Sequence, residues 1–131
     1  MLERLKRILY RSMTNCEINY KTAKQMIEKN PNTILLDVRS KQEYEEGHLP
    51  NSTFLCLYDL EKQVANKFPD KSLNIIVYCS SGNRSKQAQK ILEGMGYENV
   101  YNLKGGLNSY LGDTLWKNKG IVCLPCLKKS L

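Results

Sequence analysis

The sequence predicts an α/β fold in which a mainly parallel sheet is covered by helices. Segments with helical periodicity alternate along the chain with short apolar runs, and turn-forming residues separate them. The apolar runs are hydrophobic at consecutive positions, which is typical of strands buried on both faces of a parallel sheet. Because parallel strands need a crossover connection, a helix between successive strands fits this architecture.

The first helix and strand are expected within residues 17–38. Residues 20–29 place apolar side chains on one helical face, and Asn30-Pro31 ends this helix. Residues 33–38 follow as a compact apolar run that predicts a buried strand. Shorter strands are expected near residues 17–18 and 53–55.

The alternation of helix and strand is repeated twice in the second half of the chain. Residues 57–68 are predicted to be helical, Pro69-Asp70 ends this helix, and residues 74–78 form the next apolar strand. Residues 85–95 predict a third helix, which nearby glycines end, and residues 99–101 predict a short strand.

Length and composition predict one globular domain with two basic appendages. The chain has 131 residues, of which 41% are hydrophobic and 25% are charged, as is ordinary for a soluble domain. We expect the domain at residues 15–116. A basic amphipathic extension is expected at residues 1–14, and a basic tail at residues 117–131.

The net charge of +7 comes from the two ends of the chain. Residues 1–15 hold four basic side chains and one acidic one, residues 117–131 hold four basic and no acidic ones, and residues 16–116 hold 12 of each sign. The domain therefore has no excess positive charge that would release counterions from a polyanion. For this reason we expect no nucleic-acid partner.

Three features of the sequence predict a cytoplasmic protein. No apolar run approaches the roughly 20 residues that cross a bilayer, so no membrane span is expected. Charged residues interrupt the apolar ones at the N-terminus, unlike in a secretory signal. The five cysteines are irregularly spaced in a chain long enough to build its own core. Free thiols in a reducing compartment are therefore expected rather than a disulfide framework.

The chemistry is expected after the strand at residues 74–78, because parallel α/β sheets bind ligands beyond the carboxyl ends of their strands. Cys79 ends this strand and faces the start of the next helix. The loop that follows consists of Ser80, Ser81, Gly82, Asn83, Arg84 and Ser85. Its small residues let backbone N–H groups turn inward, and these groups, the helix dipole and Arg84 favour an anion. Since such surroundings lower the pKa of a cysteine, Cys79 is predicted to be a nucleophilic thiolate.

Several of these residues also have a purely structural interpretation. Cys79 could be a small buried apolar residue, and Ser85 could serve only as the N-cap of the following helix. Asp37 and Arg39 follow another buried strand and could orient the loop. A structural ion pair or turn explains these two residues equally well.

Other side chains that could take part in catalysis are expected to be structural. His48 is the only histidine of the chain. A role for His48 as the general base of Cys79 is the less favoured interpretation. Glu43, Glu45 and Glu46 are expected to form a solvated helix face.

The remaining cysteines have separate interpretations. Cys16 and Cys56 are interpreted as buried packing residues. Cys123-Leu-Pro-Cys126 has the spacing of a redox or metal pair but lacks the second pair of a structural zinc site. It is interpreted as an incidental pair in the tail, with a sulfur relay or partial metal binding as alternatives.

Four motifs resemble the rhodanese family in their order and spacing. They are Leu36-Asp37-Val38-Arg39, the segment from Glu43 to Gly47-His48-Leu49-Pro50, the segment from Val77-Tyr78-Cys79 to Arg84-Ser85, and Gly105-Gly106. The resemblance covers about residues 16–112. It implies a five-stranded, mainly parallel sheet with helices on both faces, a persulfide on Cys79, and loop amides that cradle this sulfur. It also favours Asp37 as a partner of the loop amides or Arg84, and a structural role for the Gly-His-Leu-Pro turn.

The sequence departs from the family pattern at two positions. Ser80 stands where many thiosulfate-using members have arginine, so one charge that could hold a sulfonate is absent. Tyr110 stands where many members have tryptophan, which is interpreted as a packing change. Four residues separate Cys79 from Arg84, one fewer than in the Cys-x5-Arg loop of cysteine phosphatases. In the resembling family the shorter loop accompanies sulfur transfer.

The sequence therefore predicts a rhodanese-type sulfurtransferase. Cys79 would take a sulfane sulfur from thiosulfate, a polysulfide or a low-molecular-weight persulfide, and pass it to a thiol of a small molecule or protein, or to another nucleophile. No metal and no organic cofactor is expected. Two alternatives remain open: a non-catalytic binding or regulatory module with this fold, and a cysteine phosphatase or arsenate reductase, which the loop length disfavours.

Overall fold

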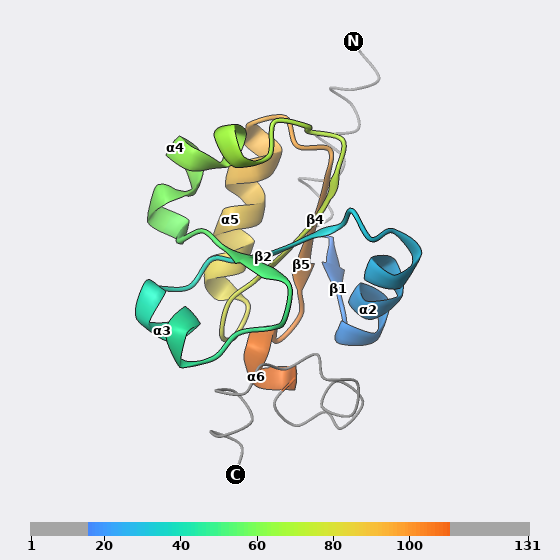
Figure 1. Ribbon diagram of the computed structural model, residues 1–131, viewed down its shortest axis with the longest axis vertical. Coiled ribbons are helices and arrows are strands. Elements are labelled where there is room, and N and C mark those ends of the chain that lie inside the picture. The colour runs from blue at the N-terminus through green and yellow to red at the C-terminus, as the bar shows by residue number, and fades with distance from the viewer. Residues whose placement is uncertain (1–15, 111–131) are drawn as a thin grey trace.

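The computed structural model describes residues 16–110, which form a five-stranded parallel sheet with helices on both faces (Figure 1). The strands lie in the order β1-β5-β4-β2-β3, and each neighbouring pair is parallel. The elements in chain order are β1 (Glu17–Ile18), α2 (Tyr20–Lys29), β2 (Ile34–Asp37), α3 (Lys41–Glu46), β3 (Ser52–Phe54), α4 (Leu57–Lys67), β4 (Asn74–Tyr78), α5 (Asn83–Gly94), β5 (Asn99–Leu103) and α6 (Gly106–Tyr110). The predicted fold class is confirmed.

The predicted elements are found close to their expected positions, with differences at three places. Strand β5 extends to Leu103, two residues beyond the predicted 99–101. Helix α5 begins at Asn83 rather than Ser85, because Gly82 adopts a left-handed conformation (φ 109°) that starts the helix inside the loop. The sequence does not predict α6, which is only five residues long and so has no periodicity to detect. The two predicted appendages, residues 1–14 and 117–131, lie outside the described residues.

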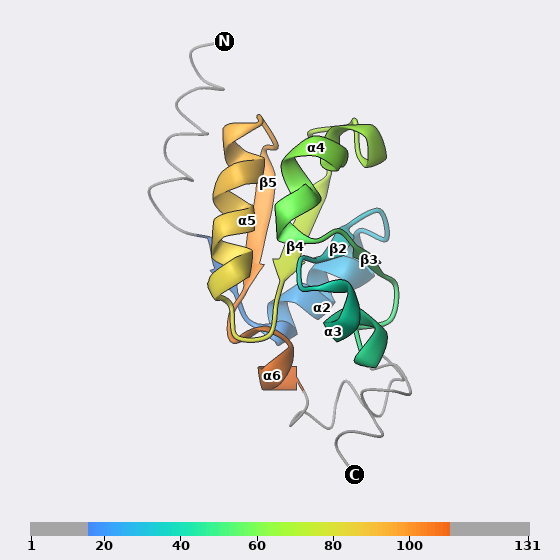
Figure 2. The same ribbon diagram turned by 90° about the vertical axis from the view of Figure 1, so that its left-hand side faces the viewer.

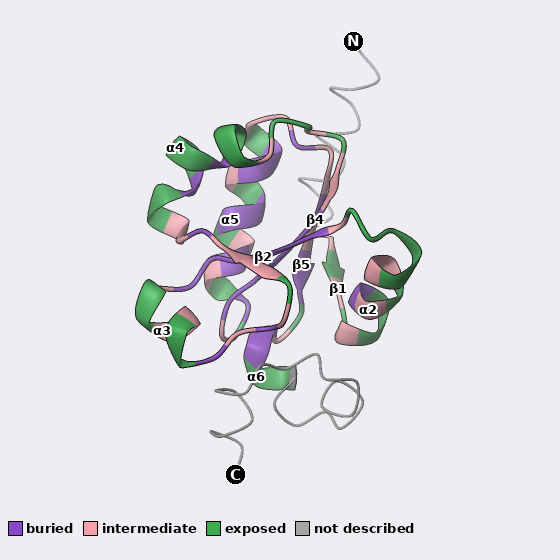
Figure 3. Ribbon diagram, viewed as in Figure 1, coloured by how far each residue is buried: buried purple, intermediate pink, exposed green. Residues whose placement is uncertain are grey.

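Two apolar layers hold helices against opposite faces of the sheet (Figure 2). Helices α4 and α5 pack on one face, and α2 and α6 pack on the other. The inner strands β2 and β4 are buried over almost their whole length, as Figure 3 shows. This position between two layers explains why their residues are hydrophobic at consecutive positions. None of the helices within residues 16–110 has both the length and the apolar character needed to cross a bilayer.

The strand register gathers the predicted functional segments at one edge of the sheet. Asp37 at the end of β2 lies beside Tyr78 at the end of β4, so the segments that follow both strands leave the sheet together. Strand β5 is the other neighbour of β4, and it leads into α6. The segments that follow three adjacent strands therefore lie together around Cys79.

A buried ion pair fixes the end of β2. The Asp37 carboxylate accepts hydrogen bonds from the backbone N–H of Arg39 at 3.0 Å and from its Nη2 at 2.7 Å. The same Nη2 donates to the carbonyl oxygen of Gly47 at 2.6 Å. Asp37 is 0% exposed and Arg39 is 5% exposed. The expectation that Asp37 pairs with Arg84 or the loop amides is therefore wrong, because Arg39 occupies the Asp37 carboxylate. Asp37 and Arg39 instead form the structural ion pair that was the alternative.

We expect Asp37→Asn to lower the free energy of unfolding by about 3–5 kcal/mol, because it leaves the buried Arg39 guanidinium without a counter-charge. Urea unfolding followed by circular dichroism measures this loss. Asp59→Asn removes the same charge from the exposed face of α4 and serves as the control, with a change within about 0.5 kcal/mol. If the two variants unfold at the same urea concentration, the ion pair does not hold this end of the sheet.

Candidate active site

The Cys79 sulfur lies within a short loop that joins β4 to α5. The backbone N–H of Gly82 donates a hydrogen bond to Sγ at 3.0 Å, and the Ser85 hydroxyl oxygen lies 3.4 Å from Sγ. Gly82 reaches this position with φ 109°, a backbone conformation that residues with a side chain rarely adopt, so a glycine is required there. Cys79 itself is 1% exposed. The loop therefore presents polar hydrogens to a buried sulfur.

Helix α6 binds two carbonyl groups of the loop. The backbone N–H groups of Leu107 and Asn108 donate to the carbonyl oxygens of Cys79 at 2.8 Å and Ser80 at 3.0 Å. This approach is possible only because Gly106 has no side chain. A Cβ atom on Gly106 would overlap the Cys79 carbonyl and lie 2.6 Å from the Ser80 carbonyl oxygen.

These surroundings favour the thiolate form of Cys79. Burial raises the pKa of the thiol, but hydrogen bonds from the Ser85 side chain and from the backbone N–H groups of Ser85, Gly82 and Ser81 outweigh burial. The pKa of Cys79 is therefore held below its ordinary value. A thiolate at the N-terminus of α5 is chemically competent as a nucleophile.

Ser85 is not an N-cap, because Gly82 holds that position and Ser85 is the third residue of α5. Its hydroxyl lies 2.5 Å from Oδ1 of Asn102 and 3.0 Å from the carbonyl oxygen of Gly82, in addition to its contact with Cys79. Asn102, in β5, is fully buried, and its amide also donates to the Gly82 carbonyl at 3.4 Å. Asn102 is not among the site residues predicted from the sequence. A buried polar residue in an otherwise apolar strand is the signal that could have revealed it.

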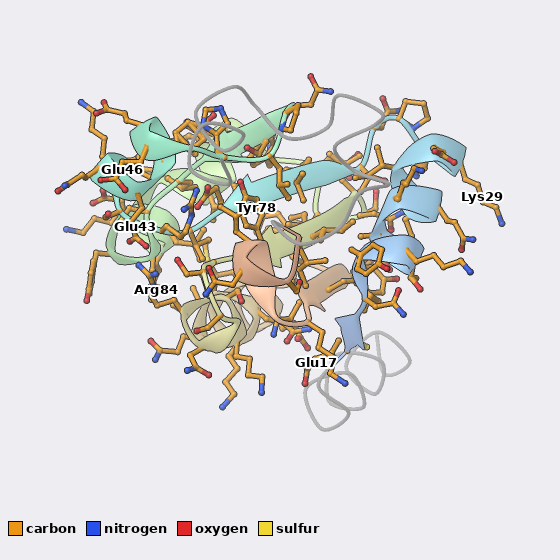
Figure 4. The ribbon with its side chains drawn as sticks, turned by 90° about the horizontal axis from the view of Figure 1, so that it is seen from below. Glu17, Lys29, Glu43, Glu46, Tyr78 and Arg84 are labelled. Carbon is orange, nitrogen blue, oxygen red and sulfur yellow. The ribbon has the colours of Figure 1, made fainter. Side chains whose placement is uncertain are left out.

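Arg84 is paired with a carboxylate at the edge of the loop (Figure 4). Its Nη1 and Nη2 atoms donate to the two carboxylate oxygens of Glu43 at 2.6 Å and 2.9 Å. The Ser80 hydroxyl donates to the same carboxylate at 3.0 Å. The expectation that Glu43 belongs to a solvated helix face is therefore wrong. The spacing Ser40-x-x-Glu43, typical of a capping box, could have shown that this glutamate is held in place.

The other singled-out residues take less direct positions. Ser81 and Asn83 have exposed side chains. The His48 ring stacks on Tyr44 at 3.6 Å, and its Nδ1 lies 2.7 Å from the Tyr44 carbonyl oxygen, which fits the structural role expected for this turn. The remaining cysteines differ in position. Cys16 and Cys56 are half-buried rather than buried, and Cys123 and Cys126 lie outside the described residues.

Comparison with known proteins finds matches over most of the chain. A model of the rhodanese-like domain family matches residues 19–113. The thiosulfate:glutathione sulfurtransferase of Saccharomyces cerevisiae is 32% identical over 112 residues, covering 74% of this chain and 81% of that protein. The putative sulfur carrier protein YrkF of Bacillus subtilis is 32% identical over 98 residues, covering 75% of this chain. The chain spans only 52% of the length of YrkF.

A solved structure has the same fold. The Alr3790 protein from Anabaena superposes with a TM-score of 0.67 and is 30% identical, covering 79% of this chain and 76% of that one. The match covers more than three quarters of each chain, so it extends well beyond the Cys79 loop.

The rate at which iodoacetamide alkylates Cys79 is expected to rise with pH to a plateau, with a midpoint below the ordinary pKa of cysteine. Ser85→Ala should move this midpoint to higher pH, because it removes a hydrogen bond that stabilises the thiolate. Peptide mapping by mass spectrometry separates Cys79 from the other cysteines. Ser72→Ala removes a hydroxyl far from the loop and should leave the midpoint unchanged. A midpoint that Ser85→Ala also leaves unchanged would exclude Ser85 as a partner of the thiolate.

Proposed function

The chain belongs to the rhodanese-like domain family, and from this premise we propose that it is a sulfurtransferase that carries a sulfane sulfur on Cys79. The observation that carries the proposal is the hydrogen bonding of the Cys79 sulfur. Its Sγ accepts a hydrogen bond from the Gly82 N–H at 3.0 Å, inside a loop whose Cys79 and Ser80 carbonyl groups are bound by α6. Oriented N–H groups in a buried site stabilise negative charge on a bound sulfur without having to reorganise.

Sulfur transfer proceeds in two displacements. In the first, the Cys79 thiolate attacks the outer sulfur of the donor, an S–S bond forms to Sγ, and the bond between that sulfur and the rest of the donor breaks. The leaving group departs with the electron pair, as a thiolate from a persulfide or as sulfite from thiosulfate. In the second, an acceptor thiolate attacks the outer sulfur of the Cys79 persulfide and regenerates the Cys79 thiolate. No cofactor is required by these steps.

The partners of this reaction are a small sulfur donor and a thiol acceptor. The Saccharomyces cerevisiae relative is named for thiosulfate and glutathione, and the Bacillus subtilis relative for sulfur carriage. For this chain we propose a polysulfide or a low-molecular-weight persulfide as the better donor, since Ser80 supplies no charge to a sulfonate. For the compartment we propose the cytoplasm, because the sequence predicts free thiols rather than a disulfide framework.

Two competing functions fit the site less well. A non-catalytic module would not need a buried cysteine whose pKa is lowered by directed hydrogen bonds. A phosphatase or arsenate reductase would use an arginine to hold the tetrahedral oxyanion, whereas Arg84 is engaged with both oxygens of Glu43. The loop is also one residue shorter than the Cys-x5-Arg loop of cysteine phosphatases.

Incubation with inorganic polysulfide is expected to add one sulfur, about 32 Da, to Cys79, because the thiolate attacks sulfane sulfur. Intact-mass spectrometry with peptide mapping measures the gain and its location. Cys79→Ser should gain no sulfur at that position, and Cys56→Ser serves as the control that keeps the reactive thiol. Equal loading of Cys79→Ser and the wild-type protein would disprove the assignment of the nucleophile.

Ser80→Arg is expected to lower the thiosulfate concentration needed for half-maximal rate by about tenfold or more, because a well-placed charge-assisted hydrogen bond contributes roughly 1.5–3 kcal/mol. Steady-state kinetics with thiosulfate and a thiol acceptor measure the change. Gln87→Arg adds the same charge to an exposed position of α5 and is the control. An identical saturation curve for Ser80→Arg and the wild type would mean that position 80 does not face the donor.

A further inference from the structure

We propose that Glu43 determines donor specificity by neutralising Arg84, so that the site selects against donors that carry a sulfonate and for persulfides that do not. This inference rests on the proposed sulfurtransferase function and adds a residue to it that lies outside the loop. Glu43 would act as a specificity-determining residue, because it holds the charge that a sulfonate would otherwise bind.

The geometry of the pair makes Arg84 a poor binder of an incoming anion. Both terminal nitrogens of the guanidinium are bound to the two oxygens of Glu43, at 2.6 Å and 2.9 Å. A sulfonate can be recognised by two parallel N–H groups of an arginine, and this is the arrangement that Glu43 already uses. The side chains of Arg84 and Glu43 are 38% and 32% exposed, so the pair faces solvent at the edge of the loop.

Glu43 is held in this position by groups other than Arg84. It is the third residue of α3 and accepts hydrogen bonds from the backbone N–H and the hydroxyl of Ser40, while Ser40 caps its N–H in return. Hydrogen bonds from Arg84, Ser40 and Ser80 outweigh burial and hold the pKa of Glu43 well below its ordinary value. The carboxylate is therefore ionised and fixed before any donor arrives.

Within residues 79–85, Arg84 is the only side chain whose positive charge could bind a sulfonate. Nearby in the sequence, Lys86 lies 3.7 Å from Glu17, and Arg39 is buried against Asp37. A dianion that approaches Cys79 thus meets the Glu43 carboxylate and a guanidinium whose charge this carboxylate already balances. A persulfide donor does not need such a cation, because its leaving thiolate carries a single charge.

Ser80 strengthens the same selection. Its hydroxyl donates to Glu43 at 3.0 Å and lies 3.3 Å from Nη2 of Arg84, so it completes the network around the carboxylate. An arginine at this position would add a second cation beside a single carboxylate. With serine, the three side chains together are neutral.

The test compares the single-turnover loading of Cys79 from thiosulfate in three variants at low ionic strength, with intact mass as the readout. Glu43→Gln removes the charge but keeps a side chain that suits the third position of a capping box. It should lower the half-saturating thiosulfate concentration by about tenfold or more and make loading strongly sensitive to salt. Glu43→Asp keeps the charge and should remain close to wild type. Glu45→Gln removes one exposed charge from the same helix and controls for net charge.

Arg84→Gln provides an independent arm if Glu43→Gln does not fold. It leaves Glu43 uncompensated, so it should raise the half-saturating thiosulfate concentration, in the direction opposite to Glu43→Gln. Shifts of opposite sign support the selection by charge. Shifts of the same sign would indicate a merely structural role for the pair and overturn the inference.

Loading from cysteine persulfide separates the inference from the proposed function. If the wild-type protein is loaded by cysteine persulfide but Glu43→Gln saturates with thiosulfate as the wild type does, the inference about Glu43 is wrong and sulfur transfer stands. An equal effect of Glu45→Gln and Glu43→Gln also overturns it. If neither cysteine persulfide, polysulfide nor thiosulfate places sulfur on Cys79 of the wild-type protein, the proposed function itself fails.

Discussion

The close contact between α6 and the Cys79 loop is the constraint on which the site depends. The N–H groups of Leu107 and Asn108 bind the carbonyl oxygens of Cys79 and Ser80, and this fixes the orientation of the peptide planes that follow. Since a peptide carbonyl and N–H point in opposite directions, the N–H groups of the loop are left for the sulfur. The contact requires β5 beside β4 in the sheet and a residue without a side chain at Gly106. Fold topology and one glycine thus create the electrostatic environment of the nucleophile.

Two carboxylates near the site each pair with one arginine, and the two pairs have different roles. Asp37, fully buried, holds Arg39 and through it the carbonyl of Gly47. Glu43, at the edge, holds Arg84. Removing a partner of the buried pair leaves a charge in a medium that solvates it poorly, whereas water can solvate both charges of the pair at the edge. The first pair therefore belongs to folding, and the second is free to influence ligand choice.

The sequence reveals the parts of this protein that depend on local patterns. Strand β4 and helix α2 follow from apolar runs and helical periodicity, and Cys79 follows from its place between a strand and a helix. The partners brought together by the fold are harder to predict. Glu43 is 41 residues from Arg84, and Asn102 is 17 residues from Ser85. Both pairs depend on how the fold brings distant segments together, so the sequence favours Asp37 as a partner of Arg84 and places Glu43 on a solvated face.

The depth of Cys79 has a consequence for the shape of its reaction partners. With 1% of the residue exposed, the thiolate offers almost no surface to a bulky molecule. A sulfur bound to Sγ extends the side chain by about 2.05 Å. Donor and acceptor thiols exchange this same outer sulfur in steps that are the reverse of each other, so the narrow access to Cys79 limits both partners alike. A thiol that can collect the sulfur can therefore, as its persulfide, also deliver it.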